Sequence, residues 1–141
     1  MNTSESQINS ELSEEHAFIT EALKAEMEAI GAVITRVSNS HQEGVAWSKA
    51  IDLLEQCEGH AVFSGMGKSG LIGAKLSATF SSIGQPSHVV HPAEAVHGDL
   101  GSIRRDDVVI LVSYSGTTEE VLNLAAILRT DGIPCIGISK E

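Results

Sequence analysis

The clearest structural signal in this chain is Val108-Val109-Ile110-Leu111-Val112, which runs directly into Ser113-Tyr114-Ser115-Gly116-Thr117-Thr118-Glu119-Glu120. A β-branched run that ends in hydroxyls and a glycine before a helix predicts the carboxyl end of a buried parallel strand. The hydroxyls can donate hydrogen bonds to phosphate oxygens, and Gly116 lets the backbone approach an anion. Helix N–H groups beyond Thr118 point at the same place. Because the turn contains no basic residue, we expect a small phosphorylated metabolite there rather than a polyanion.

A second turn of the same design lies upstream. Ala61-Val62-Phe63 predicts a strand, and Ser64-Gly65-Met66-Gly67-Lys68-Ser69-Gly70 leads from it into a helix. The apolar residues of that helix are spaced to share one face, and they are Ile72, Leu76, Phe80 and Ile83. A pair of strand–turn–helix anion sites in one chain is a sharper signal than either turn alone.

The upstream turn also fits the dinucleotide-binding fingerprint G-x-G-x-x-G. That fingerprint needs an acid near the end of the second strand to bind the ribose hydroxyls. Here the second strand ends in Val89-Val90-His91, and the first acid, Glu94, lies beyond Pro92. The missing acid argues against a dinucleotide. A nucleoside-triphosphate loop is excluded, because its first glycine would have to stand where Val62 is.

Beyond residue 59 the pattern alternates between strands and helices. It predicts strands at 60–64, 87–90, 107–112 and 133–138, helices at 68–83 and 118–130, and a loop with a helical turn at 92–100. Such alternation predicts an α/β fold, in which a parallel sheet carries helices on both faces and binds ligands at the carboxyl ends of its strands.

The N-terminal part of the chain predicts helices only. Residues 1–10 are expected to be frayed, a helix is expected over 13–37 until Ser38-Asn39-Ser40 stops it, and another over 43–57. Their amphipathic spacing indicates helices that pack on the sheet or on a partner subunit. We therefore expect a helical region at 1–58 and an α/β domain at 59–141.

The charge of the 141-residue chain is −10, and it is uneven. Residues 1–60 hold 11 acids and 3 bases, for −8, whereas residues 61–141 hold 8 acids and 6 bases, for −2. An acidic surface repels nucleic acid and anionic membranes, which argues against both as partners. The more balanced part is the one with the candidate anion turns.

Targeting and redox signals point to the cytoplasm. Cys57 and Cys135 form no C-x-x-C pair or disulfide framework. The polar, acidic start of the chain has no apolar signal-peptide core, and no apolar run has the length of a membrane span.

Several titratable residues near the turns are candidates for chemistry. Lys68 would stand at a helix N-terminus, where a cation is unfavourable unless an anionic ligand or a carboxylate compensates it. Glu120 has an ordinary alternative role as a helix-dipole partner. A third group, His91, Glu94, His97 and Asp99, crowds one loop, where proton or ligand handling is more usual than a fixed metal. His16, His41, His60 and His88 are interpreted as surface or packing residues.

Together these residues resemble the sugar isomerase (SIS) domain family, and within it the arabinose 5-phosphate isomerases of bacterial lipopolysaccharide and capsule synthesis. The resemblance covers about residues 60–140. The matching stretches are Gly65–Gly70, Phe80–Val90, His91-Pro92-Ala93-Glu94-Ala95-Val96-His97-Gly98-Asp99-Leu100-Gly101 and Ser113–Gly116. The string from His91 to Gly101 is far more specific than any glycine-rich turn.

The resemblance implies a flavodoxin-like sheet that binds a phosphosugar. It places the phosphate at the hydroxyl turns, on Ser69, Ser113, Ser115 and Thr118, with Gly67 and Gly116 allowing close approach. It implies interconversion of D-arabinose 5-phosphate and D-ribulose 5-phosphate through an enediol, in supply of the Kdo branch of lipopolysaccharide or capsule synthesis. Lys68 would contact an oxyanion or hydroxyl, Glu120 would transfer or support the transfer of a proton, and His97 would orient the substrate.

The resemblance implies no cofactor and no catalytic metal, although His97 is a possible contact for an inhibitory divalent metal. It also implies a homo-oligomer, a dimer or a tetramer. The family's chain continues through a fifth strand with a further active-site Glu and His, and often CBS modules, so the sequence is expected to be C-terminally truncated. Tyr114 and Thr117 stand where these isomerases often have Asn and Glu, which suggests an altered sugar preference. The alternatives are a non-catalytic phosphosugar-binding SIS regulatory module and a SIS enzyme acting on a hexose phosphate.

Overall fold

The computed structural model describes the backbone of residues 3–140 and the side chains of residues 12–140. Its contacts divide the chain into two compact units, residues 1–48 and residues 49–141. The first unit contains helix α1 (Thr3–Asn39) and the beginning of helix α2 (His41–Glu55). The second unit contains the end of α2, the sheet and all helices that follow it.

Helix α1 begins earlier than the sequence pattern predicted. The predicted start was residue 13 and residues 1–10 were expected to be frayed, but the helix already includes Thr3. Residues 1 and 2 lie outside the described residues. The stretch from Thr3 to Ser10 contains neither glycine nor proline, so nothing interrupts a helix that has nucleated further along.

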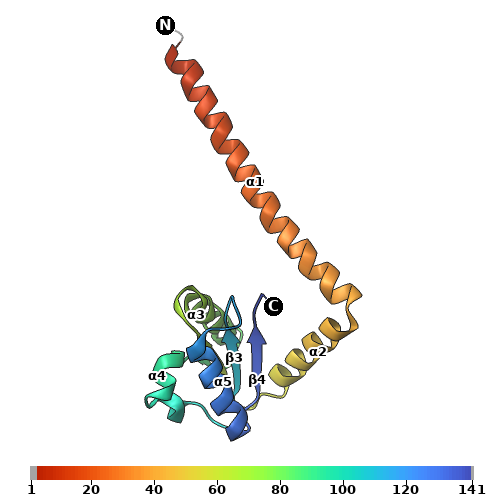
Figure 1. Cartoon of the computed structure of the whole chain (residues 1–141), viewed down its shortest axis with the longest axis vertical. Coiled ribbons are helices and arrows are strands. Elements are labelled where there is room, and N and C mark those ends of the chain that lie inside the picture. The colour runs from red at the N-terminus through yellow and green to blue at the C-terminus, as the bar shows by residue number, and fades with distance from the viewer. Residues whose placement is uncertain (1–2, 141) are drawn as a thin grey trace. The chain divides into compact units, whose positions relative to one another are not determined.

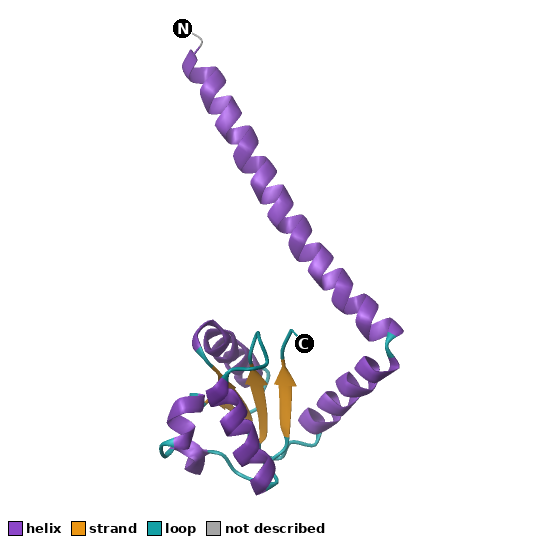
Figure 2. Ribbon diagram, in the orientation of Figure 1, coloured by secondary structure: helices purple, strands orange, loops and turns teal. Residues whose placement is uncertain are grey.

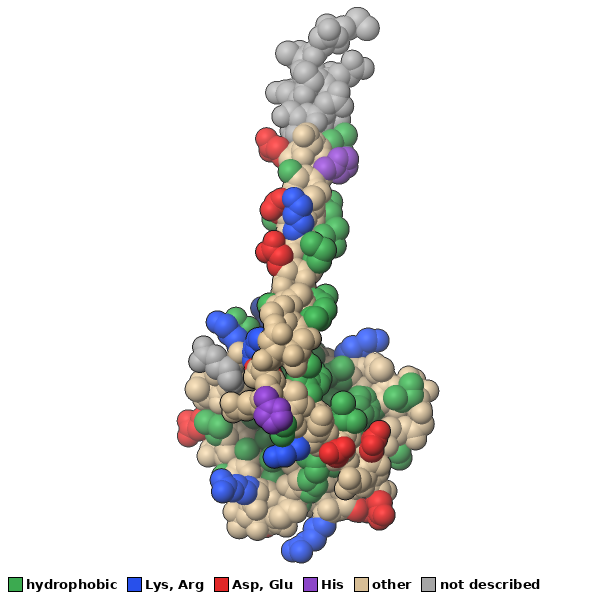
Figure 3. Space-filling view, turned by 90° about the vertical axis from the view of Figure 1, so that its right-hand side faces the viewer, with side chains coloured by type: hydrophobic (Ala, Val, Ile, Leu, Met, Phe, Trp, Pro, Cys, Tyr) green, Lys and Arg blue, Asp and Glu red, His purple; other side chains and the backbone are tan. Residues whose placement is uncertain are grey.

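An exposed apolar stripe runs along α1. Its residues recur every three or four positions and are Phe18, Ile19, Leu23, Met27, Ile30, Val33 and Ile34. Figure 3 shows these apolar side chains along one side of the helix and acidic side chains on the other. No helix in the described part of the chain is both long and apolar enough to cross a membrane.

The break between α1 and α2 falls where the sequence predicted it. The hydroxyl of Ser40 accepts a hydrogen bond from the backbone N–H of Glu43 at 3.3 Å, as in a helix N-cap. The guanidinium of Arg36, in the last turn of α1, pairs with the Glu43 carboxylate, with its Nε at 3.0 Å. Helix α2 then runs from His41 to Glu55, close to the predicted 43–57.

The second unit is built on a four-stranded sheet with the order β2-β1-β3-β4. The strands are β1 (Ala61–Gly65), β2 (Ser87–Val89), β3 (Val108–Val112) and β4 (Cys135–Ile138), and every pairing is parallel. The helices are α3 (Gly67–Ser82), α4 (Pro92–Val96), the 3₁₀ turn η1 (Asp99–Ser102) and α5 (Glu119–Asp131). This order is the beginning of the flavodoxin-like arrangement, and the predicted α/β fold is confirmed.

Helices cover both faces of the sheet (Figure 1). On one face α4 and α5 pack over Val62, Val109 and Leu111, burying residues such as Leu124 and Leu128 completely. On the other face Phe63 and Ile110 lie beneath α3 and the end of α2, with the rings of Phe63 and Phe80 edge to face at 5.3 Å. Because β1 and β3 are central and buried on both faces, their sequences are continuously apolar rather than alternating.

A buried carboxylate organises the amino edge of the sheet. Asp107 is fully buried, and its oxygens accept the backbone N–H groups of His60 and Arg104, each at 2.7 Å. The ring Nδ1 of His60 lies 3.1 Å from the same carboxylate. Burial raises the pKa of Asp107, but these hydrogen bonds outweigh it, so that the pKa lies below its ordinary value. This cluster is at the opposite end of the strands from both glycine-rich turns.

Candidate active site

The two glycine-rich turns lie next to each other in space. Strands β1 and β3 pair in parallel with Gly65 opposite Val112, so the residues that follow them emerge at the same edge of the sheet. Figure 2 shows the strands pointing toward that edge. The carboxyl edge of a parallel sheet is where α/β proteins bind ligands. The fold therefore places both turns at carboxyl ends of strands, as predicted, and the pairing of β1 with β3 makes them neighbours.

The β1–α3 turn is compressed against the sheet by glycines. A Cβ on Gly65 would lie 2.7 Å from the carbonyl oxygen of Val112, and one on Gly70 would lie 2.6 Å from the carbonyl oxygen of Gly65. Gly67 has a φ of +52°, which favours glycine. The turn therefore brings the backbone at the start of α3 directly onto the ends of β1 and β3.

Lys68 and Ser69 stand in the first turn of α3. The side chain of Lys68 is exposed, and within residues 12–140 it makes no hydrogen bond or ion pair with another side chain. No carboxylate of the described chain therefore compensates this cation at the positive end of a helix. Ser69 is half-buried, and its backbone N–H donates to the carbonyl of Met66 at 3.1 Å.

The β3–α5 turn gathers hydroxyl groups. The hydroxyls of Ser113 and Thr118 hydrogen-bond to each other at 2.9 Å, and Ser113 is buried. The hydroxyl of Ser115 accepts hydrogen bonds from the backbone N–H of Thr117 at 3.2 Å and from its hydroxyl at 3.1 Å. Gly116, with a φ of +69°, closes the turn by donating its N–H to the carbonyl of Ser113 at 3.2 Å. Of the predicted phosphate ligands, Ser113 and Thr118 are brought into direct contact.

No side chain caps either helix at this edge. The residue before α3 is Met66, which has no side-chain acceptor, and Thr118 directs its hydroxyl to Ser113 instead of capping α5. Both helices thus present first-turn N–H groups without a side-chain acceptor from the cap position. Such helix N-termini favour anions, because the helix dipole and the backbone donors act together.

Glu120 and His97 belong to two helices that pack against each other. Glu120 is the second residue of α5 and is half-buried. His97 is the exposed C-cap of α4, which follows β2 and packs against α5. In the described part of the chain, no hydrogen bond or ion pair joins the side chains of Lys68, His97 and Glu120. The fold places Lys68 and Glu120 in the first turns of the helices that follow β1 and β3, with His97 at the end of a helix that packs against α5.

The loop after β2 does not form a metal centre from the described residues. Among them, no three His, Cys, Asp or Glu side chains converge as ligands, His91, Glu94, His97 and Asp99 included. The backbone of this loop is ordered by α4, where the N–H of His97 donates to the carbonyl of Glu94 at 2.9 Å. Gly98 follows with a φ of +146° and directs the chain into η1.

Sequence reasoning missed the contacts that depend on distant parts of the chain. His60 and His88, interpreted as surface or packing residues, do pack edge to face with a centroid distance of 5.3 Å, but His60 also hydrogen-bonds to the buried Asp107. The signal available in the sequence was Asp107, an acid directly before the apolar strand β3. At the other edge, Lys140 and Tyr114 form a pair that the sequence pattern did not connect.

Comparison with known proteins identifies the family. The sequence pattern of the SIS domain matches residues 53–141. The chain belongs to the SIS domain family. Arabinose 5-phosphate isomerase KpsF of Escherichia coli, a relative, is 44% identical over 111 residues, which are 79% of this chain and 35% of the relative. Arabinose 5-phosphate isomerase KdsD of Pseudomonas aeruginosa is 41% identical over 114 residues, 81% of this chain and 33% of the relative.

A solved structure extends the likeness to the three-dimensional fold. The SIS chain is similar to Escherichia coli CFT073 c3406, solved in complex with arabinose 5-phosphate, with a TM-score of 0.70 and 40% identity, over 89% of this chain and 65% of that chain. Against the curated isomerases, the chain spans about a third of their length. The predicted SIS membership and fold are confirmed.

Proposed function

We propose that this protein is an arabinose 5-phosphate isomerase. The observation that carries the proposal is the pair of uncapped, hydroxyl-bearing helix starts on adjacent parallel strands, in a SIS chain 44% identical to such an isomerase. The substrate would be D-arabinose 5-phosphate, and the product D-ribulose 5-phosphate. We further propose that the reaction takes place in the cytoplasm and supplies the Kdo branch of lipopolysaccharide or capsule synthesis.

The phosphate would bind across the turns. Its oxygens would accept hydrogen bonds from the hydroxyls of Ser69, Ser113, Ser115 and Thr118, and from backbone N–H groups near Gly67 and Gly116. The 2.9 Å contact between Ser113 and Thr118 supports this assignment, because it holds two hydroxyls side by side at the start of α5. Binding the unreactive phosphate positions the sugar for chemistry at its other end.

The chemistry requires proton transfer beside a carbonyl. In the open-chain aldose, a base removes the proton at C2 while the carbonyl oxygen at C1 takes up a proton, which gives a 1,2-enediol. Loss of the proton on O2 and protonation at C1 then give the ketose. The oxidation at C2 and the reduction at C1 balance within the substrate, so the reaction needs no external oxidant or reductant.

Each candidate residue has a role that its chemistry can fill. Lys68 is an exposed cation at this edge without an ion-pair partner among the described residues, and it would stabilise negative charge that develops on the substrate oxygens. Glu120, half-buried at the start of α5, would move the proton or support its movement. His97 would orient the sugar hydroxyls from the loop after β2, where it would also be the contact for an inhibitory divalent metal.

We also propose that the protein is a homo-oligomer, with residues 1–58 as a helical region and 59–141 as the phosphosugar-binding domain. The exposed apolar stripe of α1 supports self-association, because a stripe of this size is unfavourable in water.

The decisive experiment is proton NMR of arabinose 5-phosphate in D₂O with the protein. Appearance of ribulose 5-phosphate, or loss of the C2 proton signal by deuterium exchange, would demonstrate enediol chemistry. Unphosphorylated arabinose and a hexose phosphate serve as matched substrates. An unchanged spectrum, together with saturable binding of arabinose 5-phosphate, would replace the isomerase with a phosphosugar-binding regulatory module.

A further inference from the structure

Strand β4 is joined to the hydroxyl turn beyond the end of the sheet. The backbone N–H of Ser113 donates to the carbonyl of Ile138 at 3.0 Å, and the N–H of Lys140 donates to the carbonyl of Tyr114 at 3.1 Å. The parallel ladder between β3 and β4 therefore continues into the turn that carries Ser113, Ser115 and Thr118. The backbone of Lys140 is therefore bound to this turn independently of the contacts of its side chain.

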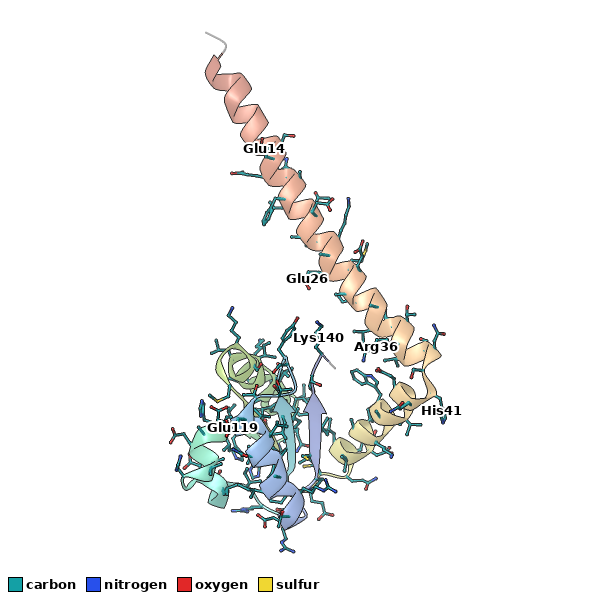
Figure 4. The ribbon with its side chains drawn as sticks, in the orientation of Figure 1. Glu14, Glu26, Arg36, His41, Glu119 and Lys140 are labelled. Atoms are coloured by element: carbon teal, nitrogen blue, oxygen red, sulfur yellow. The ribbon has the colours of Figure 1, made fainter. Side chains whose placement is uncertain are left out.

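The side chain of Lys140 also belongs to the turn. Its Nζ lies 5.8 Å from the centroid of the Tyr114 ring, which is a cation–π arrangement. Both side chains are exposed, and Tyr114 is 73% exposed. Lys140 forms no ion pair with a carboxylate of the described chain. Figure 4 shows Lys140 at the end of β4, at the edge of the sheet where Glu119 begins α5.

The hydroxyl turn contains no cation of its own. Residues 113–120 include no basic side chain, and they end with the carboxylates of Glu119 and Glu120. A phosphate dianion at the start of α5 is attracted by the helix dipole and repelled by these carboxylates. Lys68 follows β1, which pairs with one side of β3, and Lys140 follows β4, which pairs with the other side. The two cations thus flank the strand whose turn carries the hydroxyls.

We propose that Lys140 is a further substrate-binding residue, whose ammonium group, held over the ring of Tyr114, stabilises the phosphate of the phosphosugar at the β3–α5 turn. Tyr114 is the positioning residue in this pair. The inference rests on the proposed function, since it assigns Lys140 to the phosphate of the same substrate. It also gives a physical role to Tyr114, which stands where the resemblance to the isomerases leads us to expect Asn.

The test is calorimetric binding of arabinose 5-phosphate and of inorganic phosphate to wild type and variants at low salt. We expect Lys140→Met to weaken both affinities by about 3- to 10-fold, as for loss of one partly exposed charge contact. Lys140→Arg should bind nearly as wild type. Tyr114→Leu should share part of the loss and Tyr114→Phe should not, because the ring face and not the hydroxyl holds the ammonium. Lys75→Met, on the exposed surface of α3, is the matched control and should leave both affinities unchanged.

The salt dependence of binding distinguishes a charge contact between Lys140 and the phosphate from a purely structural role of Lys140. The difference between wild type and Lys140→Met should shrink as the salt concentration is raised from low to high, because an exposed charge contact is screened. If wild type binds and Lys140→Met binds equally well, the inference is overturned, and the lysine only braces β4 against the turn. If wild type binds neither ligand, the proposed function fails and this inference fails with it.

Discussion

Gly70, in the first turn of α3, lies so close to Gly65 that a Cβ on Gly70 would stand 2.6 Å from the Gly65 carbonyl oxygen. Real Cβ atoms do not approach a backbone oxygen so closely, so the junction admits only glycine at this position. The consequence is functional as well as structural. The close contact fixes where α3 begins, and with it the positions of Lys68 and Ser69 at the carboxyl edge.

Substitution of Gly70 by alanine should damage both stability and activity. The methyl group has backbone atoms in front of it, so the strand–helix junction must shift, and we expect a loss of about 1–3 kcal/mol in the free energy of unfolding. Gly73→Ala, one turn further along the same helix, is the matched control, because its Cβ would meet only the Phe63 Cβ at 3.4 Å. Urea denaturation of both variants is the measurement, and equal midpoints would contradict the tight junction.

Removal of the Lys68 ammonium should slow catalysis more than it weakens binding. If the lysine stabilises charge that develops during enediol formation, Lys68→Met should lower kcat by about 10²- to 10³-fold, with a smaller change in KM. Steady-state kinetics with arabinose 5-phosphate test this. Lys75→Met, in the middle of α3, is the control and should retain wild-type rates. A Lys68→Met enzyme within about threefold of wild type would remove Lys68 from the catalytic set.

The hydroxyls of the β3–α5 turn should contribute mainly to affinity. Ser113→Ala deletes a donor to a charged phosphate and leaves Thr118 without its 2.9 Å partner, so we expect KM to rise by about 10- to 100-fold. Residual turnover of unphosphorylated arabinose should not change. Thr79→Ala on α3, whose hydroxyl only donates to the Lys75 carbonyl, is a comparable control. A rise in KM that is equal for both sugars would indicate general distortion of the site.

The parts of the fold that could be predicted are those with a local signal. β3 and the turn after it follow from an apolar β-branched run, a glycine and a helix start, all within a few residues. β4 begins at Cys135 and not at the predicted residue 133. Ile133 is buried although it lies in the loop, and in the sequence a buried apolar loop residue cannot be told from the first residue of a strand. The predicted start of α1 was wrong for the opposite reason, since between Thr3 and Ser13 only Ile8 and Leu12 are apolar, too few to mark the start of a helix by their spacing.

The parts that could not be predicted depend on residues far apart in sequence. The bond between His60 and Asp107 joins the starts of the adjacent strands β1 and β3, although the two residues are 47 positions apart in sequence, and neither reveals its partner there. Lys140 reaches Tyr114 only because β4 pairs with β3. For the site, the sequence identified residue types and the order of the turns, whereas the register of the parallel strands determined which of them meet.

The histidine pair at the amino edge should make stability depend on pH. Burial, with a smaller contribution from neighbouring His60, lowers the pKa of His88 below its ordinary 6.5, although Asp107 opposes this. The Nε2 of His88 is buried and has no hydrogen-bond partner among the described residues. The folded protein therefore takes up a proton at His88 less readily than the unfolded chain does.

The sign of the pH effect follows from proton linkage. Well above pH 6.5, His88 is neutral in both the folded and the unfolded state, so it does not affect the free energy of unfolding. As the pH falls through 6.5, the unfolded chain binds the proton first. The free energy of unfolding therefore decreases until His88 is also protonated in the folded state. Thermal melts at about pH 7.5, 6.5 and 5.5 should show a falling Tm. His88→Phe keeps the ring contact with His60 but cannot bind a proton, so its Tm should fall less over the same range. Parallel curves for the two proteins would mean that another group carries the pH dependence.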